Sequence, residues 1–233
     1  MKKFLFLILT LNILTRCISN DNTIISQVKN IGEYNKIENN SIANVIISDK
    51  VPVNKIIMNG NKKQLRTLKF QIINKNLIFT SESSLKNISI PTTIYLNNNS
   101  LHKIRTNGIG TINSKIDQVN KNLDIEVSNI SKVFLKINNE NISLNINSSG
   151  KVYLKGTTNM FRVNVDKTGK LFADSLTCHT VNISVQKSGL AKVNASNILN
   201  ASVTDIGKIS YKKHKNLTLI KSEDKLGKII FYD

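Results

Sequence analysis

The chain has 233 residues, enough for one domain with a sizeable core, and its 10 Gly and 2 Pro exclude a linker-rich or low-complexity protein. Its formal net charge is +18, but 29 of the 33 basic residues are Lys and only four are Arg, the residue that contacts phosphates and base edges in bidentate fashion. Because Lys, Asn and Ile have AT-rich codons, a genome of that composition accounts for the Lys excess, so we expect no nucleic-acid partner and only a general attraction to anionic surfaces.

Residues 1–19 are predicted to be a signal peptide. Lys2 and Lys3 form a positive n-region, and residues 4–14 form an apolar h-region that is too short to span a bilayer comfortably. We therefore expect the mature chain to be exported, either to the cell envelope or to the periplasm or medium. An uncleaved N-terminal anchor is the alternative.

The end of this segment reads LTRC at residues 14–17 and resembles a bacterial lipobox, in which the cysteine becomes the lipidated first residue. Cys17 is therefore the expected lipid attachment site of an outer-membrane or surface lipoprotein. Arg16 departs from the lipobox pattern, because the residue before the cysteine is normally small. Ordinary cleavage after Ser19 is the alternative. In either case Cys178 is the remaining thiol, so no intrachain disulfide framework is expected.

Three regions are expected after the signal peptide. Residues 20–30 are polar and are predicted to be a tether. Residues 31–105 are predicted to cap or begin the fold, because the exposed end of a repeat stack is prone to unwanted pairing. A repeat array is expected over residues 106–233. The strand-like runs of the cap lie at residues 34–38, 42–47, 68–72, 76–80 and 88–91, with a hairpin turn expected at Asn74 and Lys75.

The array contains a repeat of roughly twenty residues, which is typical of stacked repeat architectures. Apolar and polar residues alternate over residues 152–155 and again over 161–166, with a turn expected at 157–159; such alternation indicates two short strands, each with one buried face. Ser131 stands where the later units have glycine. The glycines that open these units are Gly150, Gly169, Gly189, Gly207 and Gly227.

A unit of two short strands cannot bury its apolar face alone, so we expect the units to stack at about 4.8 Å around a continuous core. The predicted fold is all-β, a β-helix or β-solenoid with an irregular N-terminal β cap. Glycine is expected at each corner because it tolerates a positive φ. An antiparallel meander with a hairpin at each glycine is the alternative, but the constant period favours the solenoid. No sustained 3.6-residue period predicts a helix.

Several motifs occur in an informative order. IGEYNKI at residues 31–37 is followed by ANVII at 43–47, NLIF at 76–79, ISIP at 88–91 and LHKI at 101–104, and then by TNGIGTI at 106–112 and repeated Ser-Gly-x-hydrophobic turns. In this order they resemble the head GIN domain of proteins described as auto-transporter adhesins, over about residues 28–233. The resemblance implies an exported β-helical protein with a lipoprotein or ordinary signal, and it supplies no catalytic or binding residues.

Acidic side chains are the first candidates for catalysis, because β-helical polysaccharide enzymes use stacked carboxylates. Asp124 and Glu126 face outward on one predicted strand, but their equivalents in the next unit are Ser143 and Asn145, so no second acid lies directly across. We therefore expect solvated strand surface and no enzyme activity. A polysaccharide-active enzyme on the same scaffold is the alternative. The acidic candidates are Asp124, Glu126, Asp166, Asp174 and Asp205.

No metal site or cofactor is expected. The adjacent Cys178 and His179 would point to opposite faces of a strand, and a buried cysteine is the expected outcome. The Gly108-x-Gly110 motif is not followed by a predicted helix, so it is not a phosphate-binding loop. No pair of histidines has metal-ligand spacing; they are His102, His179 and His214.

Two outward columns of side chains are expected when the units stack. A lysine opens most first strands, with Leu190 interrupting, and this column is a candidate ladder for an anionic ligand; a solvated Lys-rich corner is the alternative. An asparagine column, Asn145, Asn164, Asn182 and Asn200, would bind sugars or bond to itself. The lysines are Lys132, Lys151, Lys170, Lys208 and Lys228.

These features together favour an exported, non-catalytic, adhesin-like interaction module of the cell envelope or surface. The expected partner is an anionic glycan, a lipid surface, or a host or envelope protein. A purely structural envelope lipoprotein is a further alternative, beside the polysaccharide-active enzyme.

Overall fold

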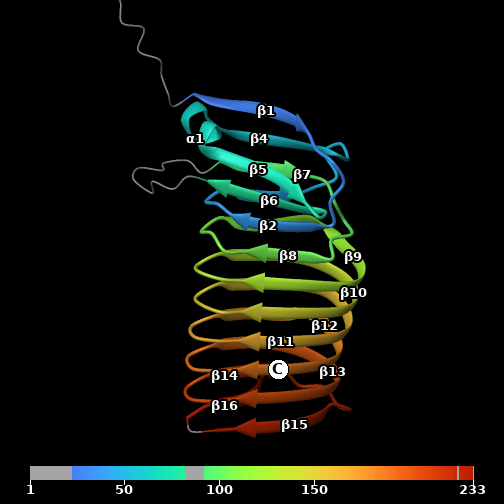
Figure 1. Ribbon diagram of the computed structural model, residues 1–233. Helices are drawn as coiled ribbons and strands as arrows, with labels where there is room; N and C mark the ends of the chain where they lie inside the picture. Colours follow the sequence, from blue (N-terminus) through green and yellow to red (C-terminus); the bar gives the residue numbers. More distant parts are fainter. Residues whose placement is uncertain (1–22, 82–91, 225, 233) are drawn as a thin grey trace, which may run out of the picture.

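The computed structural model describes residues 23–81, 92–224 and 226–232. It is a β-solenoid whose coils stack along one axis (Figure 1), which confirms the predicted fold class. Every strand of the array pairs in parallel with the next coil, so the antiparallel meander is excluded there. The array strands are β9 (Thr111–Val127), β10 (Lys132–Ile146), β11 (Lys151–Val165), β12 (Lys170–Val185), β13 (Leu190–Val203), β14 (Lys208–Lys212), β15 (Thr218–Glu223) and β16 (Lys228–Tyr232).

Each complete coil of the array is one long bent strand, whereas the sequence predicted two short strands separated by a turn. β11 runs without interruption through residues 157–159, where the turn was expected. Its ladder continues because the corner residues keep their parallel partners; Thr157, for example, lies opposite Thr177 of the next coil. At Gly156 the backbone has φ +120°, and a Cβ there would lie 1.9 Å from the carbonyl oxygen of Ile137. The bend is therefore made without breaking the ladder.

The hydrophobic core lies between the two halves of each coil. Inward side chains alternate with outward ones, as predicted, and equivalent inward side chains of successive coils stack into columns. All of them belong to one hydrophobic cluster, which also includes residues of the cap. The first halves contribute Val133, Val152, Leu171, Ala191, Ile209 and Ile229, and the second halves contribute Ile142, Phe161, Val181 and Leu199.

This arrangement leaves two outer surfaces on the array. We call the outer surface of residues 132–136 and their equivalents the lysine face. The outer surface of residues 143–145 and their equivalents is called the amide face. Side chains on either face form columns that run along the solenoid axis, because the coils are in parallel register.

The recurring glycines serve a different purpose from the one predicted. We expected them to supply a positive φ at each corner, and this is wrong: Gly156 has a positive φ, whereas Gly150 and the other recurring glycines do not. A Cβ on Gly150 would instead lie 2.5 Å from Cγ1 of Val127, the last inward side chain of an earlier coil, so glycine is required by close packing. The left-handed corner residues of the array are Asn129, Lys167, Lys187 and Asp205.

Ser131 occupies the position that Gly150 has in the next coil, and it is fully buried. Ser131 is accommodated because its neighbour in the preceding coil is Thr106, the residue directly opposite Val127 in the ladder. Thr106 thus has the same place relative to Ser131 that Val127 has relative to Gly150. The Oγ1 of Thr106 donates a hydrogen bond to Oγ of Ser131 at 2.9 Å, and Oγ of Ser131 donates to the carbonyl oxygen of Gly108 at 2.7 Å. A hydrogen-bonded Ser–Thr pair thus replaces the Gly–Val contact of the later coils.

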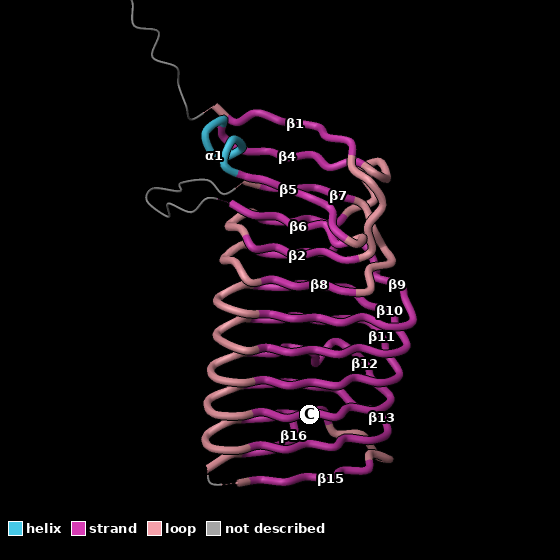
Figure 2. The backbone as a smooth tube through the Cα atoms, viewed as in Figure 1, coloured by secondary structure: helices cyan, strands magenta, loops and turns pink. Residues whose placement is uncertain are grey.

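The N-terminal part continues the same sheet (Figure 2). The predicted strands correspond to β2 (Lys36–Asn40), β3 (Asn44–Ile47), β5 (Leu68–Ile73) and β6 (Asn76–Ser81). The predicted hairpin is confirmed, because β5 and β6 are antiparallel and Asn74 and Lys75 have φ 50° and 59°. The sequence did not predict β4 (Lys55–Asn61), β7 (Thr93–Leu96) and β8 (Lys103–Thr106).

The segment expected to be a tether is partly structured. Residues 24–30 form β1 (Ile24–Asn30), which pairs with β4 in antiparallel fashion and lies at the outer end of the stack. The predicted signal peptide, Cys17 and the predicted run at 88–91 lie outside the described residues.

One short helix, α1 (Lys62–Thr67), was also not predicted. It begins at Asn61, whose side-chain Oδ1 accepts a hydrogen bond from the backbone N–H of Gln64 at 2.8 Å. Six residues are too few to display a 3.6-residue period. Among the described residues, no helix is long and apolar enough to cross a bilayer.

Candidate binding faces

The predicted lysine column is present in the structure. Lys132, Lys151 and Lys170 lie directly opposite one another on β10, β11 and β12. Leu190 follows in the same column on β13, and Lys208 and Lys228 continue it on β14 and β16. Neighbouring strands are about 4.8 Å apart, so the column is a row of closely spaced positive charges. The ligand of this row stays a prediction.

An aromatic column lies beside it, two residues further along each strand, and the sequence reasoning missed it. The rings of Phe134 and Tyr153 stack with centroids 4.6 Å apart and planes at 7°. Tyr153 and Phe172 stack at 4.7 Å and 10°. All three side chains are half-buried. An alignment of the units on their lysines would have found the column, because each ring stands two positions after a column lysine.

Two more lysines lie on the other side of the aromatic column from the lysine column. Lys136 and Lys155 are directly opposite each other on β10 and β11. Between these lysines and the rings the surface is hollowed, with a volume of about 590 Å³. Asp174 is the one acidic side chain among its lining residues, and Lys115 and Lys192 also contribute to the lining.

The acidic candidates do not form a catalytic cluster. Asp124 and Glu126 face outward on β9, as predicted, and are paired with Lys103 and Arg105 of β8. Nζ of Lys103 lies 2.9 Å from the Asp124 carboxylate, and the Arg105 guanidinium lies 2.6 Å from the Glu126 carboxylate. Partial burial by itself would raise the pKa of Glu126, but the hydrogen bonds from Lys103 and Arg105 outweigh it and hold that pKa below its usual value.

The remaining acids are dispersed. Asp166 lies at a corner, where the backbone N–H of Lys167 donates to its carboxylate and lowers its pKa; it also forms an ion pair with Lys187 at 3.2 Å. Asp174 is on the lysine face, and Asp205 is one of the left-handed corner residues. Within residues 23–81, 92–224 and 226–232, no three His, Cys, Asp or Glu side chains come together in a way that could hold a metal ion.

The histidine and cysteine candidates also lie apart. Cys178 is buried and His179 is exposed, so the two adjacent side chains point to opposite sides as predicted. Burial raises the pKa of the Cys178 thiol to about 12, which makes it unreactive at neutral pH. The ring of His214 shares a hydrogen bond of 2.7 Å with Asn194, whereas His102 lies next to β8.

The Gly108-x-Gly110 motif is a packing feature. A Cβ on Gly108 would lie 2.0 Å from the carbonyl oxygen of Ser41, and one on Gly110 would lie 1.9 Å from that of Ala43. The loop therefore lies tightly against the connection between β2 and β3. The motif is followed by strand β9, not by a helix, in agreement with the prediction that it is no phosphate loop.

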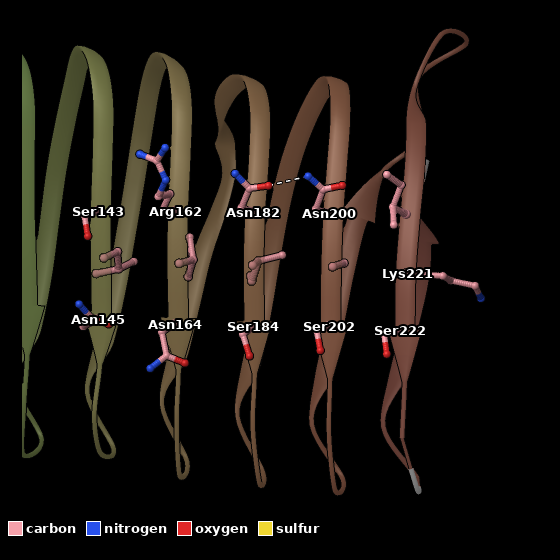
Figure 3. A pocket seen from close by; sticks show the side chains of 15 residues that line it. Ser143, Asn145, Arg162, Asn164, Asn182, Ser184, Asn200, Ser202, Lys221 and Ser222 are labelled. Atoms are coloured by element: carbon pink, nitrogen blue, oxygen red, sulfur yellow. Dashed lines mark hydrogen bonds between the residues drawn. The ribbon is translucent and has the colours of Figure 1, made fainter.

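The predicted asparagine column is wrong in its register. Asn145 and Asn164 share one column, which continues with Ser184 and Ser202. Asn182 and Asn200 belong to a neighbouring column that also contains Ser143 and Arg162 (Figure 3). The coil that runs from Asn164 to Ser184 has 20 residues, whereas the predicted step from Asn164 to Asn182 has 18, so the predicted column crosses from one column to the other. The paired residues are Ser143, Arg162, Asn182 and Asn200 in one column, and Asn145, Asn164, Ser184, Ser202 and Ser222 in the other.

These two columns line a shallow hollow of about 560 Å³ on the amide face (Figure 3). Nδ2 of Asn200 donates to Oδ1 of Asn182 at 2.6 Å, so part of the surface bonds to itself. Arg162 and Lys221 are the charged side chains among the lining residues. The hollow offers amides and hydroxyls, and it contains neither an acid–base pair nor an aromatic platform.

Most of the chain matches one known protein family. A family model described as "Putative auto-transporter adhesin, head GIN domain" matches residues 33–214. No curated protein matches the chain.

Several solved structures have the same fold. A "putative adhesin" from Bacteroides fragilis is 21% identical, with 90% of this chain and 97% of that chain covered and a TM-score of 0.79. A "putative adhesin" from Parabacteroides distasonis is 18% identical, with 91% and 98% covered and a TM-score of 0.71. A "putative lipid binding protein" from Parabacteroides distasonis is 20% identical, with 92% and 98% covered and a TM-score of 0.70.

Proposed function

Because the chain belongs to the head GIN domain family of auto-transporter adhesin-like proteins, we propose that it is an exported, non-catalytic interaction module of the bacterial cell envelope with an adhesin-like role. The observation that carries the proposal is the parallel register of the array. It places equivalent outward positions of successive coils side by side, so that mainly polar side chains form rows along the solenoid axis. Such rows suit repetitive contact with a polymer or surface.

Three further observations support the proposal. The first 19 residues have the pattern of a signal peptide, and Cys17 stands where a lipoprotein carries its acyl chains. Two similar structures are described as adhesins and one as a lipid binding protein. The outward acids Asp124 and Glu126 are neutralised by Lys103 and Arg105, which suits a structural role better than catalysis.

The location is tested by fractionating cells that express the full chain and measuring the intact mass of the mature protein, beside a Cys17→Ala variant. We expect an acylated Cys17, protease-sensitive display outside the cell, and release of the Cys17→Ala variant from the membrane fraction. An unmodified soluble chain that begins near residue 20 would remove the lipoprotein part. A full-length chain retained in the cytoplasm would overturn the proposal of export.

The interaction role is tested by adhesion of the displaying cells to immobilised glycans and to other cells, compared with cells that lack the protein. We expect the displaying cells to be retained more strongly. Shortening of a glycan on incubation with the purified protein would instead establish the enzyme alternative. Unchanged adhesion together with a weakened envelope on deletion would favour a purely structural lipoprotein.

A further inference from the structure

The hollow on the lysine face has an excess of positive charge, because four lysines and one acid, Asp174, are among its lining residues. None of the lysines that flank or line it forms an ion pair with another described residue. One row stands on each side of the rings, and the rows are four residues apart on β11, roughly 13 Å at the rise of a strand. One row consists of Lys132, Lys151 and Lys170, which stand beyond the rings from the hollow, and the other consists of Lys136 and Lys155. The lysines that line the hollow are Lys115, Lys136, Lys155 and Lys192.

The aromatic rings strengthen this preference for anions. Phe134, Tyr153 and Phe172 are stacked face to face, so both faces of Tyr153 and one face of each phenylalanine are covered by a neighbouring ring. Since the rings stack along the solenoid axis, their edges point outward. The edge of an aromatic ring carries the positive part of its quadrupole. The floor between the lysine rows is therefore apolar, and it is also favourable to anionic oxygen atoms.

We propose that this hollow binds a linear acidic polysaccharide, a polyuronate, lying along the solenoid axis. A polyuronate carries one carboxylate on each sugar ring, so its charges recur along the chain as the lysines recur from coil to coil. The carboxylates would contact the ammonium groups of Lys151 and Lys155 and their equivalents, and hydroxyl oxygen atoms of the sugars would lie over the aromatic edges. The inference rests on the proposed function and names the partner chemistry of that surface.

Two other anionic partners fit less well. Proteins bind single-stranded nucleic acids by stacking bases on the faces of aromatic side chains, and here both faces of the central ring, Tyr153, are covered by its neighbours. A lipid bilayer carries its charges on a broad surface that cannot enter the hollow between the rings and Lys136 and Lys155. The lysine face therefore fits a narrow chain better than a strand of bases or a membrane.

The test is titration calorimetry of the purified mature chain with oligogalacturonate, and with its fully methyl-esterified counterpart as the uncharged probe. We expect binding of oligogalacturonate that weakens as salt is raised, and no binding of the ester. The double variant Lys151→Gln/Lys155→Gln should bind at least tenfold more weakly. The control Lys62→Gln/Lys63→Gln removes the same charge from exposed positions of α1 and should stay within twofold of the wild type.

Tyr153 provides a second readout. Tyr153→Phe keeps the ring and should bind within twofold of the wild type, whereas Tyr153→Thr removes the central ring and should bind several-fold more weakly. Thermal unfolding of each variant identifies any that has lost its fold. The proposed site would be contradicted if Lys151→Gln/Lys155→Gln and the control Lys62→Gln/Lys63→Gln lost affinity for oligogalacturonate equally. It would also be contradicted by a Tyr153→Thr variant that folds and binds like the wild type.

The same titrations with vesicles of phosphatidylglycerol and with a single-stranded oligonucleotide separate the anionic partners. Tighter binding of either than of oligogalacturonate would overturn the inference. If the displaying cells adhere but the purified chain does not bind oligogalacturonate, this inference fails and the proposed function stands. If the chain binds oligogalacturonate but is never exported, the proposed function fails and the ligand chemistry stands.

Discussion

At the scale of single residues, the recurring corner glycines are required by space, whereas other corner residues adopt the left-handed backbone conformation. Gly150 has no side chain because Cγ1 of Val127 occupies the place where its Cβ would lie. The preceding corner solves the same problem with Ser131 and Thr106, whose hydroxyls are hydrogen-bonded to each other. Equivalent corners of the array are therefore packed in two ways, by a glycine against a valine and by a serine hydrogen-bonded to a threonine.

Gly150→Ala should destabilise the protein by about 1–3 kcal/mol, because overpacking a tight site forces neighbouring groups to move. The free energy of unfolding in urea measures the loss. Ser188→Ala, at an exposed corner position, should change stability by no more than about 0.5 kcal/mol.

The double variant Gly150→Ser/Val127→Thr recreates the Ser–Thr pair and should be more stable than Gly150→Ser alone. If the effects of the two substitutions simply add, the two positions are not coupled and the packing account is wrong.

At the scale of elements, an ion-pair network joins the strand before the array to its first coil. Lys103 and Arg105 on β8 face Asp124 and Glu126 on β9 across a parallel ladder. The network lies on the same outer surface as the amide columns, which carry few charges. It holds the cap end of the stack to the array through charge in addition to main-chain hydrogen bonds.

The pH dependence of stability should reveal this network. The pKa of Glu126 is lowered in the folded state from its ordinary value of 4.5, so its contribution to stability is present above pH 4.5 and is lost as the pH falls through the lower, folded-state pKa. Thermal unfolding should therefore show wild type more stable than Glu126→Gln near neutral pH, with the difference shrinking in acid. A difference that stays constant across this pH range would contradict the assignment.

Much of the array could be predicted from the sequence, because alternation and a regular period are local signals. The lysine column appeared in the expected register, since its members stand directly after the recurring corner glycines. The asparagine column did not, because it followed a residue type instead of a fixed distance from the glycines. Its first two members stand five residues before the next glycine, whereas Asn182 and Asn200 stand seven residues before theirs. The column of Phe134, Tyr153 and Phe172 was missed for another reason: the rings occupy outward positions, which the alternation rule reserves for polar residues.

The N-terminal part was harder to predict, because its pairing is set by distant strands. The polar segment at β1 has little local strand signal, and it is ordered by the free edge of β4. The ion pairs of Glu126 were missed because their partners, Lys103 and Arg105, precede the periodic region. In both cases the deciding contact joins parts of the chain that no repeat relates.

At the scale of the whole molecule, the positive charge is arranged in rows. Lysines in the column are about 4.8 Å apart, well within the Debye length of about 10 Å at 0.1 M salt. Their mutual repulsion opposes the stack, and the hydrophobic core compensates for it. A ligand of opposite charge would relieve that repulsion as well as make contacts of its own.

The melting temperature should therefore rise as NaCl is increased from about 0.01 to 0.15 M. We expect a rise of about 2–4 °C, the shift that a gain of about 1 kcal/mol produces in a chain of this size. The variant Lys151→Gln/Lys170→Gln should show a smaller rise. The measurement is a set of calorimetric scans of the wild type at four salt concentrations. A melting temperature that stays constant or falls as salt is raised would show that repulsion between the lysines does not destabilise the fold.

The parallel register also has an evolutionary consequence. Lys132 and Lys151 are 19 residues apart in the sequence and directly opposite in space, so one coil is a complete modular unit that contacts its immediate neighbours. An in-frame duplication of that many codons would insert another coil, extend both outer faces by one strand spacing, and leave the existing contacts intact. Selection could in this way lengthen or shorten the molecule by gene rearrangement, without first finding new side-chain packing.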